Sequence, residues 1–256
     1  ARNDGKADSS RFNLWIDGSV SAFTDREETG DEWGSFAMLN LGADYLVNDR
    51  LLLGLSFHYD RMSDPTDEDA VLKGDGWLAG PYASLEIAPN VFWDTSLLYG
   101  GSVNSVDSGL WSGDFDTRRI FADTAITGQW LLSPETTLTP KLRAVYFSEK
   151  VEDYTVDNGS GDTVSVDGFD EEQFRLSLGA ELARSFTTAD GGTFTPKVGV
   201  NAGYAGLDGA GAFASASAGF SWRPDEAWTL DADLLFTVEG DGTTSVGVKA
   251  SAGRKF

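Results

Sequence analysis

The sequence predicts an all-β protein, a closed barrel of twelve antiparallel strands that spans the bacterial outer membrane. Apolar and polar residues alternate in twelve segments, each long enough to cross a bilayer as a tilted strand of roughly 9–11 residues. Short turns alternate with longer connectors between these segments. The chain holds 30 glycines and 7 prolines among its 256 residues, and scarce proline suits strands that pair on both edges.

Each predicted strand rests on the same alternation, with apolar side chains on one face and small or polar ones on the other. In segments 12–23, 33–46, 51–61 and 76–87 the apolar faces include Ile16, Leu41, Leu55 and Leu85. In segments 91–103, 115–131, 137–148 and 173–186 they include Leu97, Ile126, Leu142 and Leu178. In segments 193–205, 211–223, 228–238 and 245–256 they include Val200, Ala216, Leu234 and Val248.

The connectors predict an orientation in the membrane. Outer-membrane barrels have tight periplasmic turns and longer external loops. The long connectors here carry nearly all of the net charge of −22, and aromatic residues gather near both ends of the strands as two interfacial girdles would. We therefore expect the long loops to be extracellular and both termini periplasmic.

Composition excludes other classes of protein. No run of 18 apolar residues is present, so no transmembrane helix is expected. The strongly acidic balance argues against nucleic acid as a partner, because phosphate binding relies on lysine and arginine. The lack of cysteine suits a chain that crosses an oxidising periplasm unfolded.

Several segments carry a resemblance to a known family. These are 14–18 (LWIDG), 41–46 (LGADYL), 53–56 (LGLS), 74–82 (GDGWLAGPY) and the terminal Phe256. Over 12–256 the chain resembles the translocator β-domain of autotransporters, the type V secretion pathway. The resemblance implies an outer-membrane barrel that anchors and exports an N-terminal passenger, with a linker helix in its lumen. It also implies a monomer in contact with outer-membrane lipid or lipopolysaccharide and with the barrel assembly machinery.

The two ends of the chain refine this interpretation. Residues 1–11 are too few to cross a bilayer as a helix at 1.5 Å per residue, so we interpret them as a linker remnant whose passenger has been removed by processing or by design. Arg254 stands where family members often carry an aromatic residue. The expected C-terminal assembly signal comprises Val246, Val248, Ala250, Ala252 and Phe256.

The polar faces predict the lumen. Twelve strands about 4.8 Å apart and tilted by roughly 40° close into a backbone diameter of about 24 Å, which leaves about 10–14 Å inside, enough for one helix. We expect a polar, water-filled lumen whose charged groups could also grip a linker helix or gate its exit. The luminal residues are predicted to be Asp17, Asp44, His58, Asp60, Glu86, Asp94, Arg119, Asp123, Lys141, Arg143, Arg175, Glu181, Lys197, Asp231, Asp233 and Lys249.

Two other functions are consistent with such a barrel. One is a stand-alone channel. The other is a surface hydrolase, in which His58 and Asp60 activate water with Asp114 and Asp116 across the rim, an arrangement that resembles ten-stranded omptin proteases. We expect neither catalysis nor a cofactor.

Two further motifs are weaker. A single histidine excludes a two-histidine metal site, and the acidic stretch 64–69 could bind calcium only loosely. The family resemblance also implies that Asn3-Asp4, which lies before the first strand, could cleave a linker through asparagine cyclisation, as happens in some autotransporters.

Overall fold

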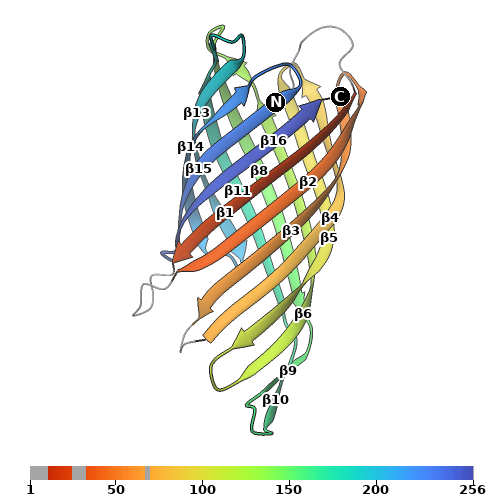
Figure 1. Cartoon of the computed structure of the whole chain (residues 1–256), viewed down its shortest axis with the longest axis vertical. Helices are drawn as coiled ribbons and strands as arrows, with labels where there is room; N and C mark the ends of the chain where they lie inside the picture. Colours follow the sequence, from red (N-terminus) through yellow and green to blue (C-terminus); the bar gives the residue numbers. More distant parts are fainter. Residues whose placement is uncertain (1–10, 25–32, 67–69, 256) are drawn as a thin grey trace.

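The computed structural model describes residues 11–24, 33–66 and 70–255. Long tilted strands wind around one barrel (Figure 1). Among the described residues, no helix has the length and apolar character needed to cross a membrane. The twelve long strands are β1 (Phe12–Thr24), β2 (Gly34–Asn48), β3 (Leu51–Thr66), β4 (Ala70–Ala88), β5 (Val91–Asp107), β6 (Ser112–Gly128), β8 (Thr136–Val151), β11 (Asp170–Arg184), β13 (Thr193–Leu207), β14 (Gly211–Arg223), β15 (Trp228–Glu239) and β16 (Thr244–Lys255).

The sheet closes on itself. Each long strand pairs antiparallel with the long strands that precede and follow it, and β1 pairs with β16 from Asn13–Lys255 to Thr24–Thr244. Four short strands accompany them: β7 (Trp130–Leu131), β9 (Tyr154–Asp157), β10 (Thr163–Val166) and β12 (Phe186–Thr187). The predicted twelve-stranded antiparallel barrel is confirmed.

The barrel has two unlike ends. Phe12 at the start of β1 lies opposite Tyr45 near the end of β2, so the chain enters at the end that carries the two-residue turn between β2 and β3. β1 begins and β16 ends at this short-turn end, and the β9–β10 hairpin projects from the opposite, long-loop end (Figure 1).

Burial is inverted relative to a soluble protein. Large apolar side chains cover the outside, and Leu55 and Val200 are 68% and 67% exposed. Among the described residues the buried set is largely polar, and it includes Asn40, Asp60 and Arg119 at 4–8% exposure. An apolar exterior around a polar interior is the pattern of a barrel whose outer face contacts lipid.

One side of the barrel is taller than predicted. Segments 62–73 and 104–114 were expected to be mostly loop, but β4 begins at Ala70 and β5 extends to Asp107. Beyond Trp77 and Val103 the outward positions become polar, with Lys73, Asp75 and Ser105, so apolar alternation ends while hydrogen-bonded pairing continues. The connector 150–172 likewise contains the β9–β10 hairpin.

Candidate functional site: the barrel lumen

Ion pairs across non-neighbouring strands identify the inner face. Arg119 on β6 reaches Asp60 on β3 at 2.9 Å, although β4 and β5 lie between them. Arg175 on β11 reaches Glu239 on β15 at 2.9 Å, across β13 and β14. Side chains can span intervening strands in this way only on the concave side of a curved sheet. These residues therefore project into the lumen.

A buried network lies in the half of the lumen nearer the long-loop end. The Arg119 guanidinium donates to Asp60 and, at 2.7 Å, to Glu149 on β8. Thr117 donates to the same Glu149 carboxylate at 2.6 Å. A Cβ added at Gly76 would collide with the Arg119 guanidinium, so glycine at this position lets Arg119 lie flat against the wall.

A second group of ion pairs lies on the opposite wall. Lys197 on β13 lies 2.9 Å from Asp233 and 3.6 Å from Asp231, both on β15. The Arg175 guanidinium also stacks over the inward-facing Phe213 ring, 4.1 Å from its centroid. These long side chains, too, run along the wall and do not reach toward the barrel axis.

A hydrogen-bonded chain crosses the seam where β16 meets β1. Lys249 lies 3.7 Å from Asp17, and the Asn40 amide donates to Asp17 at 2.6 Å. The carbonyl oxygen of Asn40 is then the acceptor for His58 Nδ1 at 2.5 Å, which assigns the proton to Nδ1 in the neutral ring. Ser56 lies 3.0 Å from His58 Nε2.

Aromatic side chains also line the lumen, which the sequence analysis missed. The Trp15 indole donates to the Tyr82 hydroxyl at 2.6 Å, and Tyr82 donates to Asp44 at 2.7 Å. Trp15 lies over Gly42 and Tyr82 over Gly54, where an added Cβ would overlap the rings. The alternation of the strand could have predicted this position, because Trp15 lies between the outward-facing Leu14 and Ile16 and therefore faces inward.

The remaining candidates differ in how firmly they are held. Arg143 pairs with Asp123, Asp94 accepts from Thr127 at 3.4 Å, and Glu86 accepts from the backbone N–H of Asn90 at 3.3 Å. Glu181 on β11 is half-buried beside Lys197. Lys141 on β8 is exposed and has neither an ion pair nor a hydrogen bond within the part of the chain that the structure describes.

The hydrolase arrangement does not assemble. Asp60 is held by Arg119, and the two ring nitrogens of His58 face Asn40 and Ser56. Asp116 lies opposite Val103, which is 64% exposed on the outer face. Asp114 shares that outer face, so the alternation of the strand places both carboxylates on the wrong side of the wall for His58.

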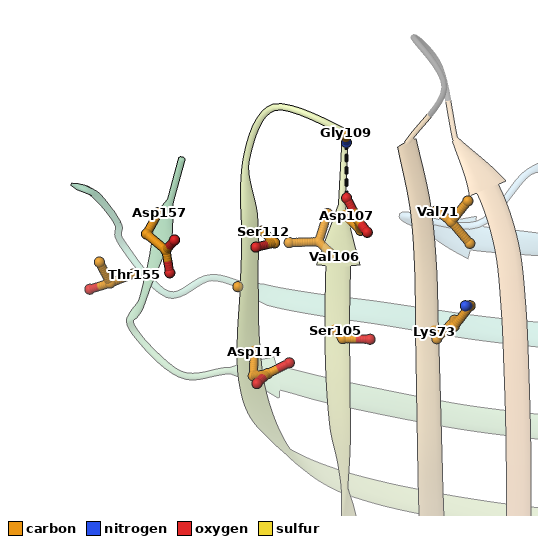
Figure 2. Close-up of a pocket in the computed structure, with 11 residues that line it drawn as sticks. Val71, Lys73, Ser105, Val106, Asp107, Gly109, Ser112, Asp114, Thr155 and Asp157 are labelled. Carbon is orange, nitrogen blue, oxygen red and sulfur yellow. Dashed lines mark hydrogen bonds between the residues drawn. The ribbon is translucent and has the colours of Figure 1, made fainter. Parts of the chain in front are cut away.

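The tall side of the barrel carries a polar recess of about 640 Å³ on its exterior (Figure 2). Asp107, Asp114, Asp157 and Lys73 line it. In the described residues no three side chains of metal-binding type are grouped so that they could hold an ion. The candidate calcium stretch 64–69 and Asn3-Asp4 lie largely or wholly outside the described residues.

The C-terminal strand presents its apolar residues outward. Val246 and Val248 are 48% and 52% exposed, and Ala250 and Ala252 follow on the same face. The Arg254 guanidinium stacks over Trp228, 5.3 Å from the ring centroid, which gives this charge a partner at the short-turn end. Phe256 lies outside the described residues.

Comparisons with known proteins agree with this geometry. A family model described as the autotransporter beta-domain matches residues 14–251. The fold is similar to the translocator domain of the autotransporter NalP from Neisseria meningitidis, with 15% identity, a TM-score of 0.75, and 99% of this chain and 90% of that chain covered. The β domain of the Bordetella autotransporter BrkA gives 16% identity, a TM-score of 0.77, and coverage of 97% and 100%.

Channel proteins match less well than these translocator domains. The monoaromatic hydrocarbon channel CymD aligns with 13% identity, a TM-score of 0.57, and coverage of 97% of this chain and 89% of that chain. No curated protein matches the chain.

Proposed function

The chain belongs to the autotransporter β-domain family, and on that premise we propose that it anchors and exports a passenger located before it in the same polypeptide. The barrel is a translocator of the bacterial outer membrane. In this proposal the passenger travels through the lumen to the cell surface, and a linker continuous with β1 stays inside afterwards. In this proposal residues 1–11 belong to that linker.

One observation carries the proposal: the long charged side chains of the lumen lie along its wall. Arg119 lies flat over Gly76, and Arg175 lies flat over Phe213. Both are paired with carboxylates from other strands, so these described side chains leave the axis of a barrel about 24 Å across clear for one polypeptide segment. The luminal charges then guide or hold that segment.

The surroundings of the barrel follow from the same proposal. The apolar exterior contacts outer-membrane lipid or lipopolysaccharide, and the barrel acts as a monomer. The outward residues Val246, Val248, Ala250 and Ala252, with Phe256, form the signal for the barrel assembly machinery. The long-loop end is extracellular, and the barrel has no catalytic role of its own.

Surface display tests the proposal. The chain is joined to a signal peptide, a folded epitope-tagged reporter and a helical linker of about 25 residues, and it is expressed in a Gram-negative host. We expect the reporter to be cleaved by protease added to intact cells. A reporter that stays protected while the barrel is inserted and heat-modifiable would contradict the proposal. The same fusion without the barrel is the control.

A stand-alone channel remains the second candidate because the hydrocarbon channel CymD shares the general fold. The lower TM-score of that match, and the family match over 14–251, favour the translocator. A channel would conduct ions or small solutes without any display of a fused reporter.

A further inference from the structure

An apolar groove lies on the outer face of the barrel where β16 meets β1, and we name it the seam groove. Its volume is about 700 Å³, and residues of β1, β2, β15 and β16 line it. The lining includes Ile16, Gly18, Leu39, Leu230, Val248 and Ala250. Ile16, Leu39 and Val248 are 42%, 44% and 52% exposed on the outer face, so the groove opens toward lipid.

Small residues give the seam groove its depth. On the outer face Gly18 lies opposite Ala250, and Ile16 lies opposite Ala252. Larger side chains border these positions, with Leu39 opposite Gly18 on β2 and Leu230 opposite Ala252 on β15. Within a membrane, association of apolar groups depends on van der Waals packing, because lipid tails are as apolar as leucine. A flexible hydrocarbon chain that fills the groove makes the most of such packing.

A cation lies at the short-turn end of the groove. Arg254 follows Ala252 on the same face of β16, and it lies opposite Leu14 on β1 and Trp228 on β15. The Arg254 guanidinium is 5.3 Å from the centroid of the Trp228 ring, a contact that holds the charge beside the groove. A guanidinium has five N–H donors and binds phosphate in a bidentate geometry. An apolar groove with such a group at one end matches the two parts of a phospholipid.

The length of the groove matches one leaflet of a membrane. Arg254 comes six residues after Val248 on β16, which is about 20 Å along the strand and about 15 Å along the axis of a barrel whose strands tilt by roughly 40°. The hydrocarbon core of a bilayer is about 30 Å thick, so one leaflet supplies about 15 Å. A lipid whose phosphate is at Arg254 can therefore extend an acyl chain along the groove as far as Val248.

We infer that the seam groove binds one anionic phospholipid, with its phosphate at Arg254 and an acyl chain along Gly18, Ala250 and Ala252. The inference rests on the proposed function for the leaflet alone: with the long-loop end outside, Arg254 faces the periplasmic leaflet. β1 and β16 pair to close the barrel. The bound lipid therefore contacts both strands of the closing seam.

Lipid titration followed by native mass spectrometry tests the inference. The 256-residue barrel is held in detergent and titrated with phosphatidylglycerol. We expect one lipid to bind more tightly than further copies, although the net charge of −22 repels anions in general. Glycerol phosphate carries a phosphate without an acyl chain, and at equal concentration it should not displace the first lipid.

Two variants of Arg254 test the phosphate contact. Arg254→Gln should weaken binding of the first lipid roughly tenfold, as suits the loss of one charged hydrogen bond, and Arg254→Lys should retain part of the affinity. Arg184→Gln is the matched control. Arg184 lies near the end of β11, away from the groove, and its guanidinium is also 5.3 Å from the centroid of an aromatic ring, that of Phe186. This variant should leave the first affinity unchanged.

A pair of leucine variants tests the acyl-chain contact. Ala250→Leu places a larger apolar side chain in the groove and should weaken the first lipid several-fold. Ala216→Leu on β14 is the control, because Ala216 lies opposite Val200 on the outer face and does not line the groove. Both substitutions keep the lipid-facing surface apolar, so both barrels should fold.

Three results would each overturn the inference. They are equal lipid affinities of the unaltered barrel and Arg254→Gln, equal affinities of Ala250→Leu and Ala216→Leu, and displacement of the first lipid by glycerol phosphate at equal concentration. Heat-modifiable migration checks that each variant is folded. The titration needs no passenger, so its failure leaves the translocator proposal standing. Failure of reporter display rejects that proposal without changing the titration.

Discussion

Arg118 and Arg119 are adjacent in the sequence and face opposite sides of the barrel wall. Arg119 is about one-tenth exposed and holds Asp60 and Glu149, whereas the Arg118 side chain is 66% exposed and pairs with Glu152 at 2.8 Å. Removing one member of a buried ion network leaves its partners charged and desolvated. Arg119 is therefore a buried position for substitution, and Arg118 is its exposed control.

We expect Arg119→Met to destabilise the barrel by about 3–5 kcal/mol and Arg118→Met by less than about 1 kcal/mol. Urea unfolding of the barrel refolded in lipid vesicles measures both. Equal midpoints for the two variants would mean that Arg119 contributes little to stability.

Glycine under an aromatic ring gives a second residue-scale prediction. A Cβ at Gly42 would overlap the Trp15 ring, whereas a Cβ at Gly253 on β16 meets nothing within 4 Å. Gly42→Ala should cost about 1–3 kcal/mol because Trp15 must leave the wall and its bond to Tyr82, and Gly253→Ala should cost much less. The urea midpoints of the two alanine variants test this prediction. Equal midpoints would contradict the conclusion that the Trp15 ring requires glycine at position 42.

The sequence predicted which residues face the lumen better than it predicted their partners. Alternation alone places Arg119 and Asp60 on the polar face. Their contact across two intervening strands depends on the curvature of the closed sheet and on Gly76 between them, and neither can be read from local pattern. Trp15 and Tyr82 were missed as luminal groups because the predicted luminal set named only charged residues and His58.

At the scale of elements, the β9–β10 hairpin is attached to the barrel at few points. β9 pairs with β6 at one position, where Asp157 lies opposite Ser112. The Tyr154 ring also stacks on Phe115, with ring centroids 4.8 Å apart. Closure between β6 and β8 runs from Thr117 opposite Val151 to Thr127 opposite Lys141. The hairpin therefore lies outside the pairing that closes the barrel.

Replacing residues 154–166 by a short glycine-serine linker should leave insertion intact and change the urea midpoint little, because loop length itself costs little free energy. Heat-modifiable migration and the urea midpoint are the measurements. Failure of the shortened chain to reach the folded form would show that the hairpin takes part in closing the barrel.

Strand ends were the least predictable part of the elements. β3, β4 and β5 extend past the predicted ends because backbone pairing continues above the membrane, where the outer face no longer needs apolar residues. The predicted strand 115–131 ends at Gly128, with β7 separate from it, and 173–186 is β11 followed by the short β12. Apolar alternation reports the lipid-facing part of a strand and not its full length.

At the scale of the whole molecule, acidic side chains outnumber basic ones on the described inner face. Among the residues that the structure describes, Asp44, Asp94 and Glu181 have no basic partner within ion-pair distance, in contrast to Asp17 or Asp123. Charges that line a narrow polar passage set its ion preference. The net charge of −22 on the chain adds to the same field at the long-loop mouth.

Current through the reconstituted barrel should therefore prefer cations. Reversal potentials under a potassium chloride gradient give the permeability ratio. The preference should weaken near 1 M salt, where screening acts over about 3 Å. Anion preference at low salt would contradict this assignment of the luminal charges.

The unequal strand lengths have a consequence for anything that leaves the lumen. β4 has 19 residues and β16 has 12, a difference of roughly 20 Å at about 3.3 Å per residue. The rim of the barrel is therefore oblique, and it is higher on the β4 side than on the β16 side. An emerging chain is free of the β16 side first and stays beside β4 and β5 longest, so its exit has a preferred direction.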